Sequence, residues 1–171
     1  RNPVGQAGTY RLPEAQLDRF MVKTSIGYPD EAAMRRILTE QTMAGGRGPI
    51  VQPVMTAGTL IQLQDFAAEV YVSPLIADYL TRLVEATRAA REVRLGASVR
   101  GALALQRAAR AWALVHSRGY VVPDDVRDLA IAVLAHRLVL EPEAEFDGVT
   151  AEQGVGRILL DVPQPQENGT A

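Results

Sequence analysis

The chain has 171 residues, a length typical of one domain or of one domain with part of a second. Hydrophobic residues make up 47% of it, enough for a packed core, while the net charge of −2 argues against a general binder of nucleic acid or anionic membranes. The lack of cysteine excludes a disulfide scaffold and thiolate metal sites and agrees with a cytoplasmic location, and no apolar run approaches the ~18 residues of a membrane span.

The N-terminal part of the sequence predicts a loop, a short helix and one strand. Residues 3–12 are rich in glycine, and Pro13 suits the first position of a helix in PEAQLDRF. Residues 20–26 then alternate up to Gly27 in the manner of a strand. A lone strand cannot satisfy its own backbone, so we expect its sheet partners to lie outside this sequence. The chain begins at Arg1 rather than at methionine, and we expect it to be a piece of a longer protein.

The remainder of the sequence predicts helices whose first turns carry capping residues or proline. Such starts occur near residues 30, 56, 73, 98, 123 and 150, and a short extended segment is expected at 138–140. The Pro-rich, polar residues 163–171 predict a disordered tail. The expected fold is therefore mainly α, a small helical bundle joined to the end of an α/β element.

Arg100 is the first candidate for chemistry. If Ser98 caps the helix, Arg100 is its second residue, beside unpaired amides and the positive end of the helix dipole. A cation there costs from a few tenths to about 1 kcal/mol unless an anion is bound, and with an anion the same groups form a phosphate site. Arg107 and Arg118 fall on roughly the same face, so the alternative is a solvated basic stripe.

Arg19 and Asn2 are the other candidates. Arg19 follows Asp18 at the end of the short helix, where it either forms a surface ion pair of little energetic value or points outward across a subunit boundary. Asn2 precedes Pro3, which disfavours helical geometry, and an amide at the end of a strand can hold a water molecule. The spacing of serine, histidine and carboxylate residues does not support a hydrolase triad.

Several segments together resemble the MoxR family of AAA+ ATPases. The resemblance rests on a long segment of this sequence, NPVGQAGTYRLPEAQLDRF, and on a short one, GASVRG. A third segment of this sequence, VVPDDVRDLAIAVLAHRLVL, is similar to the one that follows the short motif in the family. The resemblance extends from residue 2 to about residue 162. It implies that residues 1–29 end an α/β nucleotide-binding domain, that residues 30–162 form a helical AAA+ lid, and that residues 163–171 are a disordered tail.

The resemblance also implies roles for the candidate residues. Asn2 matches the first sensor, which positions the attacking water. Arg19 matches the arginine finger, which reaches the ATP of the neighbouring subunit, and Arg100 matches the second sensor, which contacts the γ-phosphate in its own subunit. Ser98 opens the helix that presents Arg100. Catalysis of phosphoryl transfer is largely positioning and charge neutralisation, which suits arginine residues.

The sequence departs from the family pattern at several positions, and these departures limit the nucleotide binding and hydrolysis that we expect of this chain alone. Val99 replaces the usual proline before the second-sensor arginine, and Val122 replaces the Ser or Thr expected before Pro123. The sequence contains no G-x-x-x-x-G-K-[ST] loop and no apolar strand ending in Asp-Glu. We therefore expect ATP and Mg²⁺ to be bound by the intact protein, and this chain alone to bind nucleotide weakly or not at all and to be inactive.

For the whole protein the family implies a ring, commonly a hexamer, that uses ATP hydrolysis to remodel partner proteins. A partner with a von Willebrand factor A domain is expected, and neither nucleic acid nor a membrane is. The alternative is a stand-alone helical module that binds DNA or protein without nucleotide chemistry, using the stripe of Arg100, Arg107 and Arg118. The sequence does not name the remodelled partner.

Overall fold

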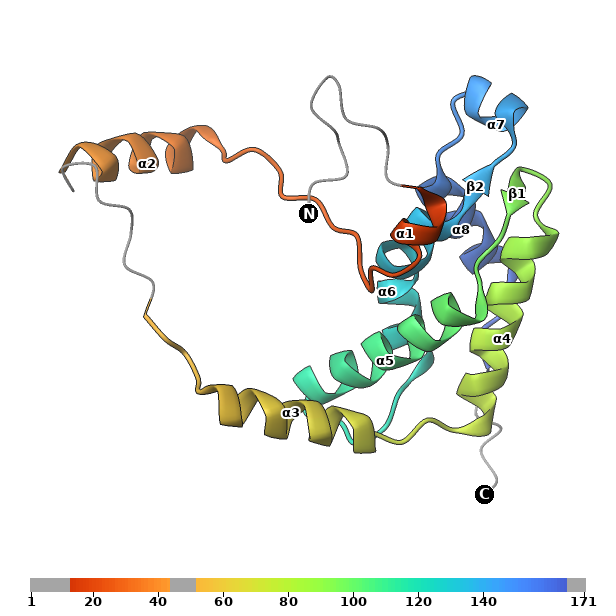
Figure 1. Ribbon diagram of the computed structural model, residues 1–171, viewed down its shortest axis with the longest axis horizontal. Helices are drawn as coiled ribbons and strands as arrows, with labels where there is room; N and C mark the ends of the chain where they lie inside the picture. The colour runs from red at the N-terminus through yellow and green to blue at the C-terminus, as the bar shows by residue number, and fades with distance from the viewer. Residues whose placement is uncertain (1–12, 44–51, 166–171) are drawn as a thin grey trace. The chain divides into compact units, whose positions relative to one another are not determined.

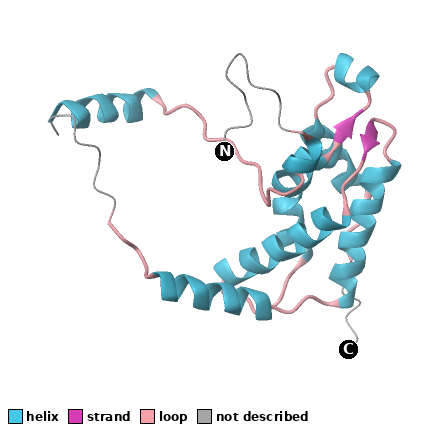
Figure 2. Ribbon diagram, in the orientation of Figure 1, coloured by secondary structure: helices cyan, strands magenta, loops and turns pink. Residues whose placement is uncertain are grey.

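The computed structural model describes residues 13–43 and 52–165 (Figure 1). It divides into two compact units, each described here by itself. The larger unit comprises Arg1–Lys23 and Leu63–Ala171, and the smaller unit comprises Thr24–Gln62. Helices dominate both units (Figure 2), as the sequence predicts.

The larger unit is a bundle of helices around one apolar core. Its main helices are α4 (Pro74–Ala89), α5 (Val99–Val115), α6 (Pro123–Leu134) and α8 (Ala151–Asp161), with α5 packed along α6. Shorter helices are α1 (Glu14–Leu17), η1 (Ala135–Arg137) and α7 (Pro142–Phe146). The largest fully buried side chains include Tyr79, Leu83, Leu105, Val126, Leu134 and Val155.

The helices of this unit begin where the sequence places their caps. The hydroxyl of Ser73 accepts the N–H of Ile76 at 3.3 Å, immediately before Pro74 opens α4. Thr150 and Gln153 form a reciprocal capping box at the start of α8. These contacts are local in sequence, which is why the pattern of residues suffices to predict them.

Two short antiparallel strands close one end of the bundle. Strand β1 (Val93–Leu95) pairs with β2 (Val139–Leu140) through Val93 opposite Leu140, with an irregularity in the register. The sequence predicts β2 as an extended segment but does not predict β1. The chain segments before α4 and α6 are joined by a parallel bridge between Tyr71 and Tyr120.

The predicted strand at 20–26 is wrong, because the structure has neither helix nor strand between Phe20 and Asp30. Ile26 is 98% exposed and lies beside no strand among the described residues. The pattern of alternating side chains indicates a strand only where a partner strand supplies hydrogen bonds. Within this segment, the N–H of Lys23 donates a hydrogen bond to the carbonyl of Ala132, in the larger unit, at 2.9 Å.

The smaller unit contains α2 (Glu31–Met43), and α3 (Ala57–Glu69) begins within it. The carboxylate of Asp30 accepts the N–H of Ala33 at 2.7 Å, as expected of a helix cap. Apolar residues of α2 such as Met34 and Ile37 stay largely exposed, and α3 buries none of its residues. In the described part of the chain, no helix combines the length and apolar character needed to cross a membrane.

Candidate functional site

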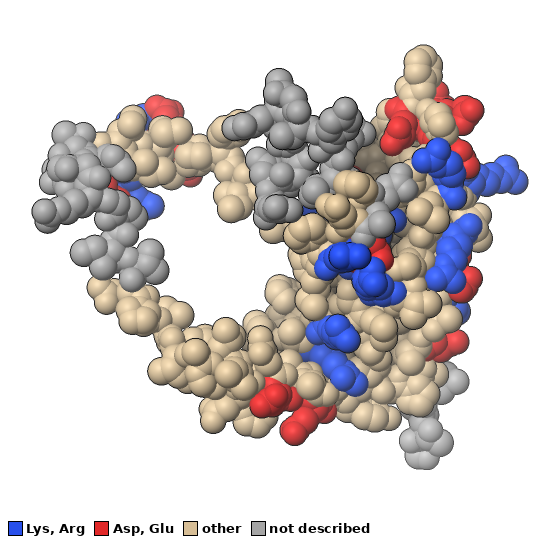
Figure 3. Space-filling model, viewed as in Figure 1, with Lys and Arg blue, Asp and Glu red and all other residues tan. Residues whose placement is uncertain are grey.

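Arg19, Arg100 and Ser98 come together in the larger unit, whereas Asn2 lies outside the described residues. The two arginines line one hollow of about 570 Å³, although 81 positions separate them in the sequence. Two further arginines line it, Arg107 and Arg137. Figure 3 shows basic side chains gathered over α5, the helix that carries Arg100. The hollow is therefore suited to an anion.

The segment before Arg100 is held against α4 by Gly96 and Ala97. A Cβ on Gly96 would lie 2.8 Å from the backbone of Arg88, so only glycine allows the segment to approach α4 this closely. The N–H of Ala97 donates to the hydroxyl of Thr87 at 2.9 Å, and the Nε of Arg88 donates to the carbonyl of Ala97 at 3.0 Å. The start of α5 is thus fixed to α4 before Ser98.

Ser98 and Asp18 then set the direction of Arg100. The hydroxyl of Ser98 accepts the N–H of Gly101 at 3.3 Å and donates to the carboxylate of Asp18 at 3.1 Å. Arg100 is the second residue of α5, as predicted, and its Nη1 donates to the other oxygen of Asp18 at 3.1 Å. Its side chain is still 59% exposed, so the guanidinium keeps donors for a further anion.

Arg19 is exposed on the turn that follows α1. Its backbone N–H donates to the carbonyl of Gln16 at 3.2 Å, so the turn itself is ordered. Its guanidinium has no hydrogen bond or ion pair to any residue in the described ranges. The surface pair with Asp18, which the sequence left open, is not formed; the Asp18 carboxylate instead contacts Ser98, Arg100 and Arg137.

Arg137 is the residue that sequence reasoning missed. Its side chain is only 2% exposed, and its Nη2 donates to the carbonyl oxygens of Phe20 at 2.7 Å and Asp18 at 3.3 Å. Its Nε lies 3.3 Å from a carboxylate oxygen of Asp18 without an aligned hydrogen bond. Burial lowers the pKa of Arg137 while the charge of Asp18 opposes that shift. An arginine between Ala135 and Leu138 in an apolar run was the available signal.

His136 lies against the same turn. Its Nε2 is 3.0 Å from the carbonyl oxygen of Phe20 and 2.7 Å from Nη1 of Arg137. Burial lowers the pKa of His136, so the imidazole is neutral near pH 7. The described residues contain no group of three His, Cys, Asp or Glu side chains that could hold a metal ion. The arginines that line the hollow offer hydrogen-bond donors and positive charge to an anion.

Arg118 does not extend the basic stripe that the sequence suggested. It forms two hydrogen bonds to the carboxylate of Asp125, at 2.7 and 2.5 Å, and a third to the carbonyl of Tyr120 at 3.2 Å. Asp125 also accepts the N–H of Val122, the N-cap residue of α6, at 2.9 Å, while Val122 itself supplies no side-chain cap. Arg100 and Arg107 both line the hollow, whereas Arg118 binds Asp125 in the first turn of α6.

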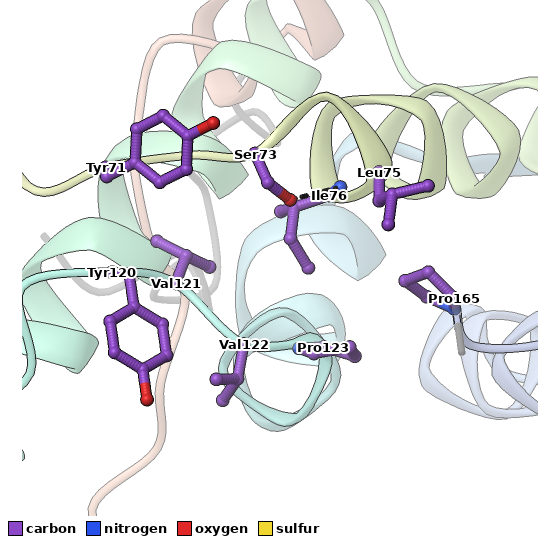
Figure 4. A pocket seen from close by; sticks show the side chains of 9 residues that line it. All are labelled: Tyr71, Ser73, Leu75, Ile76, Tyr120, Val121, Val122, Pro123 and Pro165. Atoms are coloured by element: carbon purple, nitrogen blue, oxygen red, sulfur yellow. Dashed lines mark hydrogen bonds between the residues drawn. The ribbon is translucent and has the colours of Figure 1, made fainter. Parts of the chain in front are cut away.

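A second hollow of about 240 Å³ lies where α4 and α6 begin (Figure 4). It is lined by the two tyrosines of the parallel bridge together with apolar and proline residues. Its only lining hydroxyl besides the tyrosines is that of Ser73, which already caps α4. Its residues offer no nucleophile and base pair, so the arginine-lined hollow is the candidate functional site.

Part of the chain matches a family of known domains. A family model described as the AAA lid domain matches residues 85–158. The chain is 42% identical over 167 residues to the uncharacterized protein YeaC of Bacillus subtilis, covering 96% of this chain and 51% of YeaC. It is 38% identical over 177 residues to the chaperone MoxR1 of Mycobacterium tuberculosis, covering 98% and 46%.

Solved structures agree with the sequence comparisons. The crystal structure of a proposed ATPase from Cytophaga hutchinsonii superimposes with a TM-score of 0.86 at 32% sequence identity. That match covers 97% of this chain and 53% of the other chain. The chain therefore spans about half the length of the relatives it matches.

Proposed function

Because the chain belongs to the MoxR family of AAA+ ATPases and contains the AAA lid domain, we propose that it is the sensor and lid part of an ATP-hydrolysing ring protein. The observation that carries this proposal is the hollow shared by Arg19 and Arg100. In the proposal, residues 1–29 end the nucleotide-binding domain and residues 30–162 form the lid. The intact protein binds ATP with Mg²⁺ in the cytoplasm.

Arg19 and Arg100 act on the terminal phosphate in this proposal. Arg19 is the arginine finger, because its guanidinium is exposed and has no partner in the described part of the chain. Arg100 is the second sensor, and the uncapped amides at the start of α5 beyond Ser98 add to the attraction for an anion. Asn2 is assigned as the first sensor on its sequence match alone, since it lies outside the described residues.

The shared hollow also favours a different subunit arrangement from the one the sequence implies. The family resemblance assigns Arg19 to the neighbour's nucleotide and Arg100 to its own. Two guanidinium groups that line one hollow are suited to one anion, so we assign both to the nucleotide of the same neighbouring subunit.

The chemistry asked of these residues is positioning and charge neutralisation. Mg-ATP supplies the transferable phosphoryl group and is held by the remainder of the protein, since this chain has no phosphate-binding loop. Arg19 and Arg100 present fixed cations to the charge that develops on the phosphate oxygens, and Arg107 adds to the positive potential of the hollow. Ser98 holds the first turn of α5 in place through its bond to Gly101.

Assembly and partners of the intact protein follow from the same proposal. A finger that acts across a subunit boundary requires a ring, for which we propose a hexamer. The similarity to the chaperone MoxR1 supports remodelling of partner proteins, and we propose a partner with a von Willebrand factor A domain.

The experiment that tests the assignment is Arg19→Ala in the full-length protein. We expect ATP turnover to fall by roughly 10³- to 10⁵-fold, the range found for arginine fingers. Nucleotide binding, measured by titration calorimetry, should change little because the finger acts mainly in the transition state. An unchanged turnover number in well-formed rings would contradict the proposal.

A mixing experiment tests the subunit arrangement. Rings of Arg19→Ala and rings of Arg100→Ala are each made, and then subunits of the two are mixed. If both arginines act on the same neighbour, every site lacks one of them and mixing restores no activity. If they act on different nucleotides, some interfaces regain both arginines and turnover recovers, which would overturn the shared-site assignment.

A further inference from the structure

We propose that Asp18 and Arg137 are positioning residues that fix the turn carrying Arg19 to the start of α5, so that Arg19 and Arg100 act as one unit. The inference rests on the proposed function and assigns roles to two residues that the family resemblance leaves without any. The contacts that carry it join residues more than 80 positions apart.

Asp18 is the centre of the arrangement. One carboxylate group meets the hydroxyl of Ser98, a terminal nitrogen of Arg100 and the Nε of Arg137, at distances of 3.1 to 3.3 Å. The side chain of Asp18 is 21% exposed, so these charges are screened less than at an open surface. Because Asp18 is the neighbour of Arg19 in sequence, fixing the one fixes the backbone of the other.

Arg137 holds the same turn by its main chain. Its Nη2 donates to the carbonyl of Asp18 and to the carbonyl of Phe20, the residues immediately before and after Arg19. Its Nη1 lies 3.4 Å from the carbonyl of Met21 and also bonds to the carbonyl of Val133 in α6. The backbone around Arg19 is therefore fixed on both sides, while the guanidinium of Arg19 remains available at the hollow.

The burial of Arg137 argues for such a role. A buried ion pair is generally no more stable than apolar residues of similar volume, so stability alone does not explain a charged side chain here. A planar group with five donors can hold several carbonyl oxygens at once, and the single ammonium of lysine cannot reproduce that geometry. Arg137→Lys therefore keeps the charge and removes the arrangement of donors.

Gly101 gives a second way to disturb the same contact. A Cβ on Gly101 would lie 3.1 Å from the Cδ of Arg137, closer than an ordinary van der Waals contact. Gly101→Ala therefore displaces the stem of Arg137 by a few tenths of an ångström without changing any charge or hydrogen-bonding group. The two variants disturb one contact by different means.

The test is a double-mutant cycle on the full-length ring protein. Arg137→Lys and Asp18→Asn are each introduced alone and together with Arg19→Ala, and single-turnover ATP hydrolysis is measured. We expect each single variant to lower kcat by roughly 10- to 100-fold, as misplacement of a catalytic group by about 1 Å does, while the KM for ATP is unchanged. On the Arg19→Ala background Arg137→Lys should lower kcat by a much smaller factor, because the turn that it holds no longer carries the finger. Asp18→Asn should keep part of its effect there, because Asp18 also holds Arg100.

A matched control comes from the Arg118–Asp125 pair of the same unit. Arg118→Lys disturbs a partly buried ion pair away from the hollow, so it should lower the melting temperature without changing kcat. Melting curves recorded for all variants separate a loss of fold from a loss of positioning. Gly101→Ala, which removes no polar group, reports on the geometry if Arg137→Lys fails to fold.

The outcomes distinguish the inference from the proposed function. If Arg19→Ala leaves kcat unchanged, the proposed function fails. If Arg19→Ala abolishes turnover but folded Arg137→Lys and Asp18→Asn turn over normally, only the inference fails. Equal fold-losses for Arg137→Lys in the presence and absence of Arg19 would also overturn it, because they would show that Arg137 does not act through Arg19.

Discussion

Two arginine–aspartate pairs in the larger unit use the same chemistry over very different distances along the chain. Arg118 and Asp125 are seven positions apart, and their hydrogen bonds all stay within residues 118–125, where they close the start of α6. Arg137 and Asp18 are 119 positions apart, and their contacts join α1, η1 and the start of α5. The first pair fixes one helix end. The second determines where two other arginines lie.

The difference suggests that an ion pair gains a functional role when its partners come from separate elements and a free cation sits beside it. Arg100 contacts the second pair through Asp18, and Arg19 follows Asp18 in the chain. Changes at the first pair should therefore lower stability and leave kcat unchanged. Changes at the second pair should lower kcat.

The largest effect on stability is expected from Arg118→Ala. It leaves the carboxylate of Asp125, a residue only 2% exposed, buried without its partner, which costs about 3 kcal/mol or more. Thermal unfolding of the full-length protein should shift to lower temperature while kcat per folded ring stays at the wild-type value. A tenfold loss of kcat in folded Arg118→Ala rings would remove the distinction between the two pairs.

Acid conditions should weaken the first pair. Burial alone would raise the pKa of Asp125, but hydrogen bonds from Arg118 and from the N–H of Val122 lower it below its ordinary value of 3.8. Because the folded pKa lies below the unfolded one, the carboxylate contributes stability above the unfolded pKa, and that contribution is lost as the pH falls through the folded pKa. When the pH is lowered from neutral to below about 4, the melting temperature of Asp125→Asn should therefore fall by less than that of the wild type.

A pH dependence of the same size in both proteins would mean that other groups dominate the acid response.

The smallest effect on stability is expected from Gly101→Ala. Replacing glycine within a helix favours the folded state by roughly 1 kcal/mol, whereas the close contact with Arg137 opposes that gain. The melting temperature should thus change little, while kcat falls because Arg137 shifts. A variant with a raised melting temperature and normal kcat would show that Arg137 tolerates the displacement, and the second pair would then resemble the first.

Local contacts explain how much of the fold could be predicted. Ser73, Ser98 and Thr150 bond to groups three residues away, so the sequence pattern alone predicts the starts of α4, α5 and α8. The alternation at 20–26 gives a strand only with a partner, and no partner strand lies beside it in the described residues. Strand β1 was missed for the same reason, since its pairing depends on residue 140, far along the chain.

The candidate site was predictable only in part. Arg19 and Arg100 were candidates from their positions at the ends of helices, their roles came from the family resemblance, and those roles stay a prediction. The resemblance did not identify Arg137. Its role depends on contacts with Asp18 and Phe20, which are 119 and 117 positions away in the sequence, and a local pattern does not show such contacts. The position of Asp18 between Ser98, Arg100 and Arg137 likewise becomes visible only in three dimensions.

Arg137 contacts the turn through the carbonyl oxygens of residues 18, 20 and 21, which every amino acid possesses. The identities of the side chains at 20 and 21 are therefore largely irrelevant to how the turn is held. Phe20, which does not line the hollow, can be replaced to alter solubility or to attach a reporter group, and the guanidinium at position 19 should keep its placement.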